Sequence, residues 1–142
     1  MTSDELKTFC RVNLGIRKPI LGSERTRSFD PDWDEASLEW IKKEARKAVV
    51  KRREKGLSWK KNGSDCDNWA LWVQSDVTEA YAVKNKDRQH NSILFGFAQG
   101  KTDKNETHAF NLAITGGEAY VFNYGEIVED HTGWKFNEVT FV

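Results

Sequence analysis

The sequence has few cysteines, few prolines and no long apolar run. Among its 142 residues are two cysteines and two prolines. Cys10 and Cys66 have different surroundings and belong to no spaced metal motif, so in a reducing compartment we expect two free thiols rather than a disulfide. No apolar stretch approaches the length that crosses a bilayer, which argues against a membrane-spanning helix and a membrane partner.

A secretion signal is also missing from the start of the sequence. Residues 1–14 carry charges where a signal peptide needs its apolar centre. We therefore expect a cytoplasmic protein.

The composition is typical of a folded, soluble domain. Hydrophobic residues make up 38%, aromatic residues 12% and charged residues 31%, which is too apolar for disorder and too charged for a membrane protein. A chain of this length can bury one sizeable core. We expect a single domain over residues 1–142, with a helical half at 1–63 and a helix followed by an antiparallel sheet at 64–142.

The net charge is zero, but the charges are distributed unevenly. Residues 42–61 hold ten Lys or Arg against two Glu. Such a segment can bind nucleic acid or another polyanion. A solvated helix face followed by a charged loop is the more common outcome, so nucleic acid is the less favoured partner.

Helical periodicity dominates the first half of the chain. A first helix is predicted to open at Ser3 and to end near Gly15, where glycine can close it, with Cys10 on its buried face. The stretch from Lys18 to Asp32 contains both prolines and is predicted to be a surface connection.

Two longer helices are expected to follow. The first is capped by Asp32 or Asp34 and runs to about Glu54, before Gly56. Its apolar stripe consists of Leu38, Ile41, Ala45, Ala48 and Val49. The next begins with Ser64 as its N-cap and Asp67 as a capping-box acid, and continues to Tyr81.

From Ser92 onward the apolar residues alternate, which predicts strands. The expected strands cover 93–98, 107–115 and 118–122, with one or two more around 126–129 and 135–142. Gly116-Gly117 predicts a two-residue hairpin turn, because both positions need positive φ. The fold class is therefore α+β, with N-terminal helices packed on a C-terminal antiparallel sheet.

The hairpin brings two polar side chains together. With Thr115 opposite Glu118, strand alternation places His108 and Asn123 on one face of the sheet as diagonal neighbours. That face also carries Phe110 and other apolar residues, so we expect the helix that begins near Cys66 to pack against it.

The position of Cys66 favours a reactive thiol. It falls in the first helical turn, where unpaired backbone amides and the helix dipole stabilise a thiolate. The expected packing would bring the thiol, the His108 imidazole and the Asn123 carboxamide to one end of the contact between helix and sheet. Burial alone is the ordinary explanation for a cysteine on an apolar helix face.

Two short motifs carry a resemblance to a known family. Residues 64–70, SDCDNWA, followed by residues 107–112, THAFNL, resemble the cysteine and histidine motifs of papain-like cysteine proteases. The nearest form is the catalytic domain of a mushroom agglutinin, together with related small phage proteins. The resemblance extends from Ser64 to the C-terminus and implies a papain-like core.

The resemblance also implies roles for individual residues. Cys66 would be the nucleophile, His108 the general base and Asn123 the residue that orients the imidazole. Agglutinin-like members use a Glu in that third role, and Glu126, three residues after Asn123, is an alternative for it. The upstream Gln that papain-like enzymes use in the oxyanion hole is missing, and Asn62 or the backbone amide of Cys66 would take its place.

The resemblance implies little about cofactors. Agglutinin-type members depend on calcium, which makes Asp65 and Asp67 weak candidate ligands. Two carboxylates are far from a calcium site, and they are more simply read as charges that complement the helix dipole. We therefore predict no cofactor.

Several functions remain open from the sequence. The first is a cysteine-dependent peptidase or amidase, which we expect to be phage-encoded and to act in a host cytoplasm on a protein or peptide substrate. The alternatives are an inactive papain-like protein that binds and inhibits a host protein, and a transglutaminase-like or acyltransferase-like enzyme that uses the same thiolate chemistry.

Overall fold

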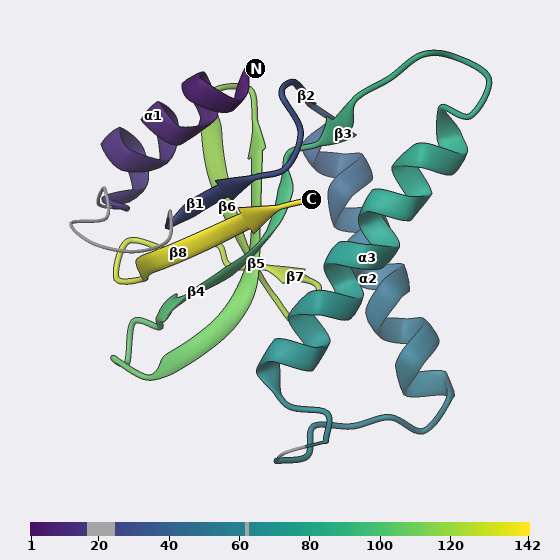
Figure 1. Ribbon diagram of the computed structural model, residues 1–142. Coiled ribbons are helices and arrows are strands. Elements are labelled where there is room, and N and C mark those ends of the chain that lie inside the picture. Colours follow the sequence, from purple (N-terminus) through teal and green to yellow (C-terminus); the bar gives the residue numbers. More distant parts are fainter. Residues whose placement is uncertain (17–24, 62) are drawn as a thin grey trace.

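The computed structural model describes residues 1–16, 25–61 and 63–142. Over these residues it contains three helices and eight strands (Figure 1). The helices are α1 (Ser3–Leu14), α2 (Leu38–Glu54) and α3 (Cys66–Lys84). The strands are β1 (Thr26–Ser28), β2 (Trp33–Asp34), β3 (Ser92–Ile93), β4 (Phe95–Lys101), β5 (Thr107–Thr115), β6 (Glu118–Asn123), β7 (Glu126–Ile127) and β8 (Lys135–Phe141).

Six strands form one sheet in the order β1-β8-β4-β5-β6-β7, and β2 pairs with β3 separately. Within the six-stranded sheet all pairs are antiparallel except β1 with β8. The predicted α+β class is therefore confirmed. The predicted hairpin register is also confirmed, because Thr115 pairs with Glu118 across Gly116-Gly117.

The sheet is covered on both faces (Figure 1). One core cluster joins Leu6 and Cys10 of α1 to Phe110, Leu112 and other residues on one face of the sheet. A second cluster joins α2 and α3 to the opposite face, which carries Phe95, Ala113 and Phe122. The prediction that the Cys66 helix packs on the face of His108 and Phe110 is therefore wrong, because that face holds α1.

The ends of α1 follow the sequence closely. Thr2 caps the helix and forms a capping box with Glu5. Gly15 ends it with φ 67°, the left-handed conformation that glycine adopts without steric cost. The predicted span from Ser3 to near Gly15 is confirmed.

The cap predicted for α2 is wrong. Ser37 caps this helix by accepting from the Trp40 amide. Asp34 instead lies in β2, where its carboxylate accepts hydrogen bonds from the Tyr81 hydroxyl and the Asn91 amide. The predicted end of the helix, Glu54, and the buried stripe from Ile41 to Val49 are confirmed.

The connection before α2 contributes more than a surface loop. Of the predicted loop from Lys18 to Asp32, residues 18–24 lie outside the described residues. Thr26–Ser28 forms β1, which pairs in parallel with β8 at the sheet edge. Three residues are too few for alternation to reveal a strand. No helix in the described chain is long and apolar enough to span a membrane.

Candidate active site

Cys66 is the first residue of α3, and Asp65 is its N-cap. The Asp65 amide donates to Asn68 Oδ1 at 3.3 Å, as in a capping box. The prediction that Ser64 is the N-cap and Asp67 the capping-box acid is wrong. The Ser64 hydroxyl instead donates to the Ser58 carbonyl, which ties the preceding loop to the start of the helix.

The two cysteines lie in different surroundings. Cys10 is fully buried, and burial raises the pKa of its thiol to about 12. Cys66 is only half-buried and stands where the first amides of α3 have no partner within the helix. Cys66 is therefore the more accessible of the two thiols.

His108 and Asn123 are joined by a hydrogen bond. His108 lies near the start of β5 and Asn123 at the end of β6, and His108 Nε2 is 2.7 Å from Asn123 Oδ1. Since an amide oxygen only accepts, Nε2 carries the proton in the neutral ring. The lone pair of the neutral imidazole is then on Nδ1, which can serve as a base.

Aromatic rings hold the imidazole in place. The His108 ring stacks on Phe110 with centroids 6.4 Å apart, and Trp134 contacts it edge-on at 6.2 Å. A third ring, Tyr124, meets it edge-on at 5.6 Å. These contacts and the hydrogen bond to Asn123 fix the ring plane.

Tyr124 connects the histidine with the cysteine. Burial raises the pKa of its hydroxyl, and the negative charges of Cys66 and Asp65 raise it further. Tyr124 also contacts the Trp69 ring edge-on at 6.5 Å, and Trp69 lies in the first turn of α3, which begins at Cys66. Tyr124 therefore contacts both the His108 ring and the first turn of the Cys66 helix.

A tight hairpin sets the positions of Asn123 and Tyr124. Asn123 pairs with Glu126, and the two turn residues, Tyr124 and Gly125, have φ of 50° and 78°. Positive φ at both positions is typical of a type I′ turn. Neither this turn nor a role for Tyr124 is predicted from the sequence, although the glycine at the second turn position is a signal for such a turn.

The other candidate for orienting the histidine points elsewhere. Glu126 accepts two hydrogen bonds from the Arg46 guanidinium, at 3.2 and 3.1 Å. It is therefore engaged with α2, and Asn123 is the residue that contacts the imidazole.

Buried amides fix α3 against the sheet. Asn111 is 1% exposed, and its side-chain nitrogen donates to the Ala70 carbonyl at 2.8 Å and the Gly96 carbonyl at 3.2 Å. From the helix, Gln74 donates to the carbonyls of Phe95 and Thr140. The sequence motif contained Asn111, but its positioning role becomes apparent only once α3 is seen on that face.

The remaining predicted site residues are not joined into a further site. Asn62, proposed for the oxyanion hole, lies outside the described residues. Asp65 caps the helix and Asp67 accepts from the Asn68 amide. Within the described ranges, no group of three or more His, Cys, Asp or Glu residues is placed to hold a metal ion.

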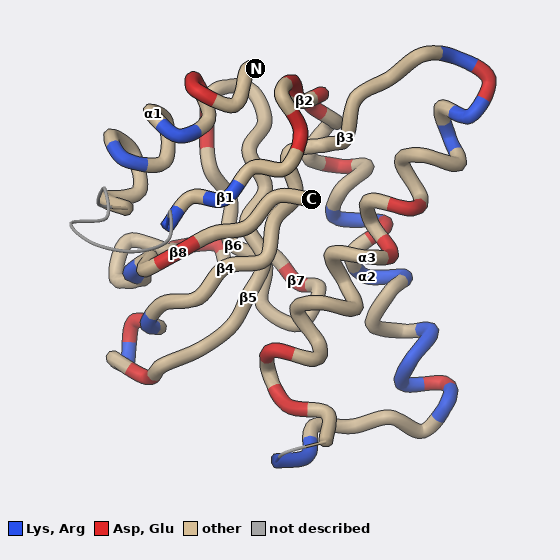
Figure 2. Tube along the Cα trace, in the orientation of Figure 1, with Lys and Arg blue, Asp and Glu red and all other residues tan. Residues whose placement is uncertain are grey.

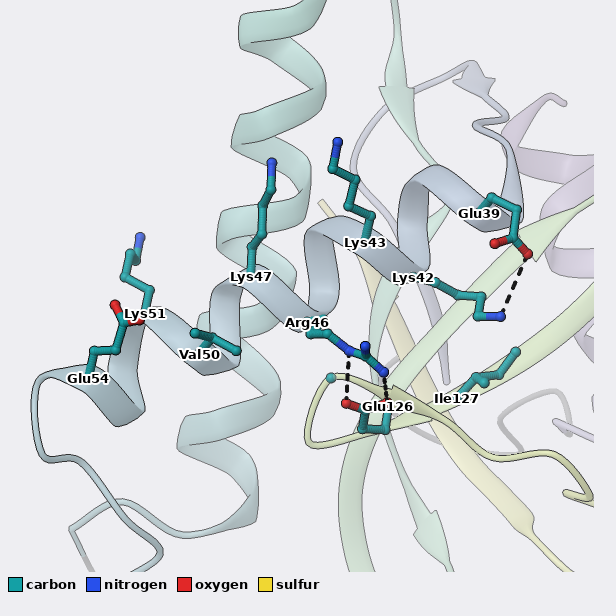
Figure 3. Close-up of a pocket in the computed structure, with 11 residues that line it drawn as sticks. Glu39, Lys42, Lys43, Arg46, Lys47, Val50, Lys51, Glu54, Glu126 and Ile127 are labelled. Carbon is teal, nitrogen blue, oxygen red and sulfur yellow. Dashed lines mark hydrogen bonds and ion pairs between the residues drawn. The ribbon is translucent and has the colours of Figure 1, made fainter.

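Half of the basic side chains in the segment 42–61 form ion pairs with acidic neighbours. Figure 2 shows its positive charges along α2 and the following loop. Five of the ten basic side chains form ion pairs: Lys42, Arg46, Lys47, Lys51 and Arg52. The pocket between α2 and β7 is also lined by Glu39, Glu54 and Glu126 (Figure 3). Its mixed charges do not favour a polyanion.

Comparisons with known proteins show similarity in fold. No protein-family model and no curated protein matches the sequence. A structure described as a PSL1a–E64 complex is 14% identical, with a TM-score of 0.76 over 99% of this chain and 51% of that one. A Polyporus squamosus lectin, bound to a human-type influenza-binding epitope, is 13% identical, with a TM-score of 0.74 over 99% and 49%.

The chain spans about half the length of both matched structures. At this level of identity the likeness concerns the fold and not the activity. The matched protein PSL1a has a papain-like core. The similarity covers nearly the whole chain, including the helical half in which the sequence motifs showed no resemblance. The chain described here has the papain-like fold of the Polyporus squamosus lectin PSL1a.

Proposed function

We propose that this protein is a cysteine-dependent hydrolase that cleaves a peptide or other amide bond. The single observation that carries the proposal is the hydrogen bond between His108 and Asn123, made close to Tyr124, which also contacts Trp69 in the first turn of the Cys66 helix. A thiol at a helix start and an imidazole oriented by an amide are the components of a thiolate nucleophile with its base.

In the proposed reaction, His108 Nδ1 takes the proton of the Cys66 thiol. The thiolate attacks the carbonyl carbon of the substrate, and the carbonyl oxygen takes up the negative charge. The backbone amide of Cys66, at the positive end of α3, is the donor available to that oxygen.

Collapse of the intermediate breaks the carbon–nitrogen bond. The leaving amine takes its proton from His108, and a thioester to Cys66 remains. Water then attacks the thioester while His108 accepts one of its protons, which releases the carboxylic acid and the thiol. Asn123 accepts from Nε2–H throughout, so that Nδ1 always faces the reaction.

Thiol reactivity tests the proposal directly. A thiolate paired with imidazolium persists at pH 6, where an ordinary thiol is almost wholly protonated. We expect iodoacetamide to label Cys66 about tenfold faster at pH 6 than it labels a free cysteine peptide. Cys10 should remain unlabelled while the protein is folded, because its pKa is about 12.

The histidine variants provide the control. His108→Ala should remove the fast labelling at pH 6, whereas His131→Ala, in a loop between β7 and β8, should leave it unchanged. E64, an epoxide that alkylates reactive thiols, should react with Cys66 under the same conditions. Slow labelling that does not depend on His108 would contradict the proposal and favour an inactive protein that binds a partner.

A further inference from the structure

A pocket at the first turn of α3 is not used in the proposed reaction. Its volume is about 560 Å³, which is within the usual range for ligand sites. We call it the aromatic pocket. Its lining residues come from the end of α2, the following loop, α3 and the β6–β7 turn: Arg53, Leu57, Ser58, Trp59, Trp69 and Tyr124.

The inner wall of the aromatic pocket is rigid. Trp69 is 3% exposed, and its indole N–H donates to the Ser64 carbonyl at 3.0 Å. Trp72 contacts it edge-on at 5.4 Å, and Tyr124 does so at 6.5 Å. A wall fixed in this way needs no rearrangement to receive a ligand.

The outer wall is a loop that is tied to the start of α3. Lys60 and Ser64 exchange backbone hydrogen bonds of 3.1 and 3.0 Å, and the Ser64 hydroxyl donates to the Ser58 carbonyl. The loop nevertheless exposes two large apolar side chains, with Trp59 56% exposed and Leu57 38% exposed. Adjacent exposed apolar side chains at the mouth of a pocket are typical of a binding site.

Arg53 gives the aromatic pocket one positive charge. The neighbouring side chains Lys51 and Arg52 both pair with Asp76. In the part of the chain that the structure describes, Arg53 has no ion-pair partner. It is therefore available to a negatively charged group of a ligand.

Tyr124 links the aromatic pocket to the candidate active site. The same ring lines the pocket, contacts the His108 imidazole at 5.6 Å and contacts Trp69, in the first turn of the Cys66 helix, at 6.5 Å. A side chain held in the aromatic pocket would therefore belong to a residue close to the bond under attack.

We propose that the aromatic pocket binds an aromatic side chain of a peptide substrate, next to an acidic residue that meets Arg53. This inference rests on the proposed hydrolase function, for which it names the substrate class. A peptide fits better than a sugar, because the lining is mostly apolar and offers few groups for a ring of hydroxyls. Burial of a phenylalanine side chain there contributes about 1.5–3 kcal/mol, or roughly ten- to hundredfold in affinity.

Peptide binding to a Cys66→Ala variant tests the inference without catalysis. The probes are the blocked peptides acetyl-Gly-Phe-Glu-Gly-amide and acetyl-Gly-Glu-Phe-Gly-amide, with titration calorimetry as the measurement. We expect at least one of the two peptides to bind, and its affinity to fall tenfold or more when Phe is replaced by Ala. Replacement of Glu by Gln in the peptide should weaken binding by a smaller factor.

Variants of the lining residues assign the effect to the aromatic pocket. Adding Trp59→Ala should abolish the preference for Phe over Ala, and adding Arg53→Gln should abolish the preference for Glu over Gln. Phe29→Ala and Arg11→Gln serve as matched controls, because both side chains are exposed and neither lines the pocket. Both controls should bind as the parent does.

The outcomes separate this inference from the proposed function. Fast, His108-dependent labelling of Cys66, together with peptide binding that shows no preference for Phe over Ala, would overturn the role proposed for the aromatic pocket. The hydrolase proposal would then still stand. A Phe preference abolished by Trp59→Ala, with slow labelling, would support the pocket and overturn the hydrolase. Binding of lactose that Trp59→Ala abolishes, with no binding of either peptide, would overturn the inference in favour of a sugar.

Discussion

Replacing Asn111 with alanine should destabilise the protein and weaken the attachment of α3 to the sheet. The variant loses the hydrogen bonds to the Ala70 carbonyl at 2.8 Å and the Gly96 carbonyl at 3.2 Å, in a site that is 1% exposed. Each bond contributes about 1 kcal/mol net, and the space left by the carboxamide adds to the loss. We expect the free energy of unfolding to fall by about 2–4 kcal/mol.

Urea unfolding followed by far-ultraviolet circular dichroism measures this change. Asn111→Asp keeps the shape but turns acceptor oxygens toward two carbonyls, so at neutral pH it should cost at least as much as alanine. Asn137→Ala removes an exposed asparagine from β8 and should change stability by less than about 0.5 kcal/mol. Equal stabilities of the Asn111→Ala and Asn137→Ala variants would refute the role given to the buried carboxamide.

Three other substitutions test the turn, the cysteine and an ion pair. Gly125→Ala should cost about 2–4 kcal/mol in urea unfolding, because φ is +78° and a Cβ would lie 2.5 Å from Val49 Cγ2 and 2.7 Å from the Ala45 carbonyl oxygen. Gly117→Ala, with φ +76° and no atom within 4 Å, should cost only about 1 kcal/mol. Cys66→Ser should lower the pKa of Tyr124, because the charge of Cys66 raises that pKa in addition to burial. An absorbance titration measures the change, and the Tyr124→Phe variant identifies the signal of this tyrosine. An unchanged titration would place the sulfur far from the phenol. Burial opposes ionisation of Asp76, but Arg52 and Lys51 outweigh it and lower the carboxyl pKa in the folded state. The resulting stabilisation is present above the unfolded pKa of about 3.9 and disappears as pH falls through the folded pKa. Asp76→Asn should therefore lower the free energy of unfolding by about 1 kcal/mol at pH 7 and by almost nothing at pH 2. A loss of stability that does not depend on pH would contradict the ion pair.

The features that could be predicted from the sequence are those set by local chemistry. Two adjacent glycines specify a tight turn, and that turn alone fixed the register of β5 against β6. The same register placed His108 and Asn123 as diagonal neighbours, and their side chains form a hydrogen bond. Helix positions were also accessible, because the spacing of apolar residues and the terminal Gly15 are visible in the sequence.

The features that could not be predicted depend on tertiary packing. In β5, every residue from Ala109 to Ile114 is buried, so alternation does not reveal which face receives which helix. The cap of α2 was predicted wrongly because aspartate is a preferred N-cap residue. Asp34 instead lies in β2, where its carboxylate accepts hydrogen bonds from Tyr81 and Asn91. Neither partner is near Asp34 in the sequence.

The corrected position of α3 limits where the proposed chemistry can occur. His108 lies on the sheet face that carries α1, whereas Cys66 begins a helix on the opposite face. A thiol and an imidazole on opposite faces can meet only around the end of the sheet, where β5 begins and β6 ends. Tyr124 lies at this end, in contact with the imidazole and with Trp69 in the first turn of the Cys66 helix. On the proposed mechanism, therefore, the turn that holds Tyr124 matters as much to catalysis as the strands that carry His108 and Asn123.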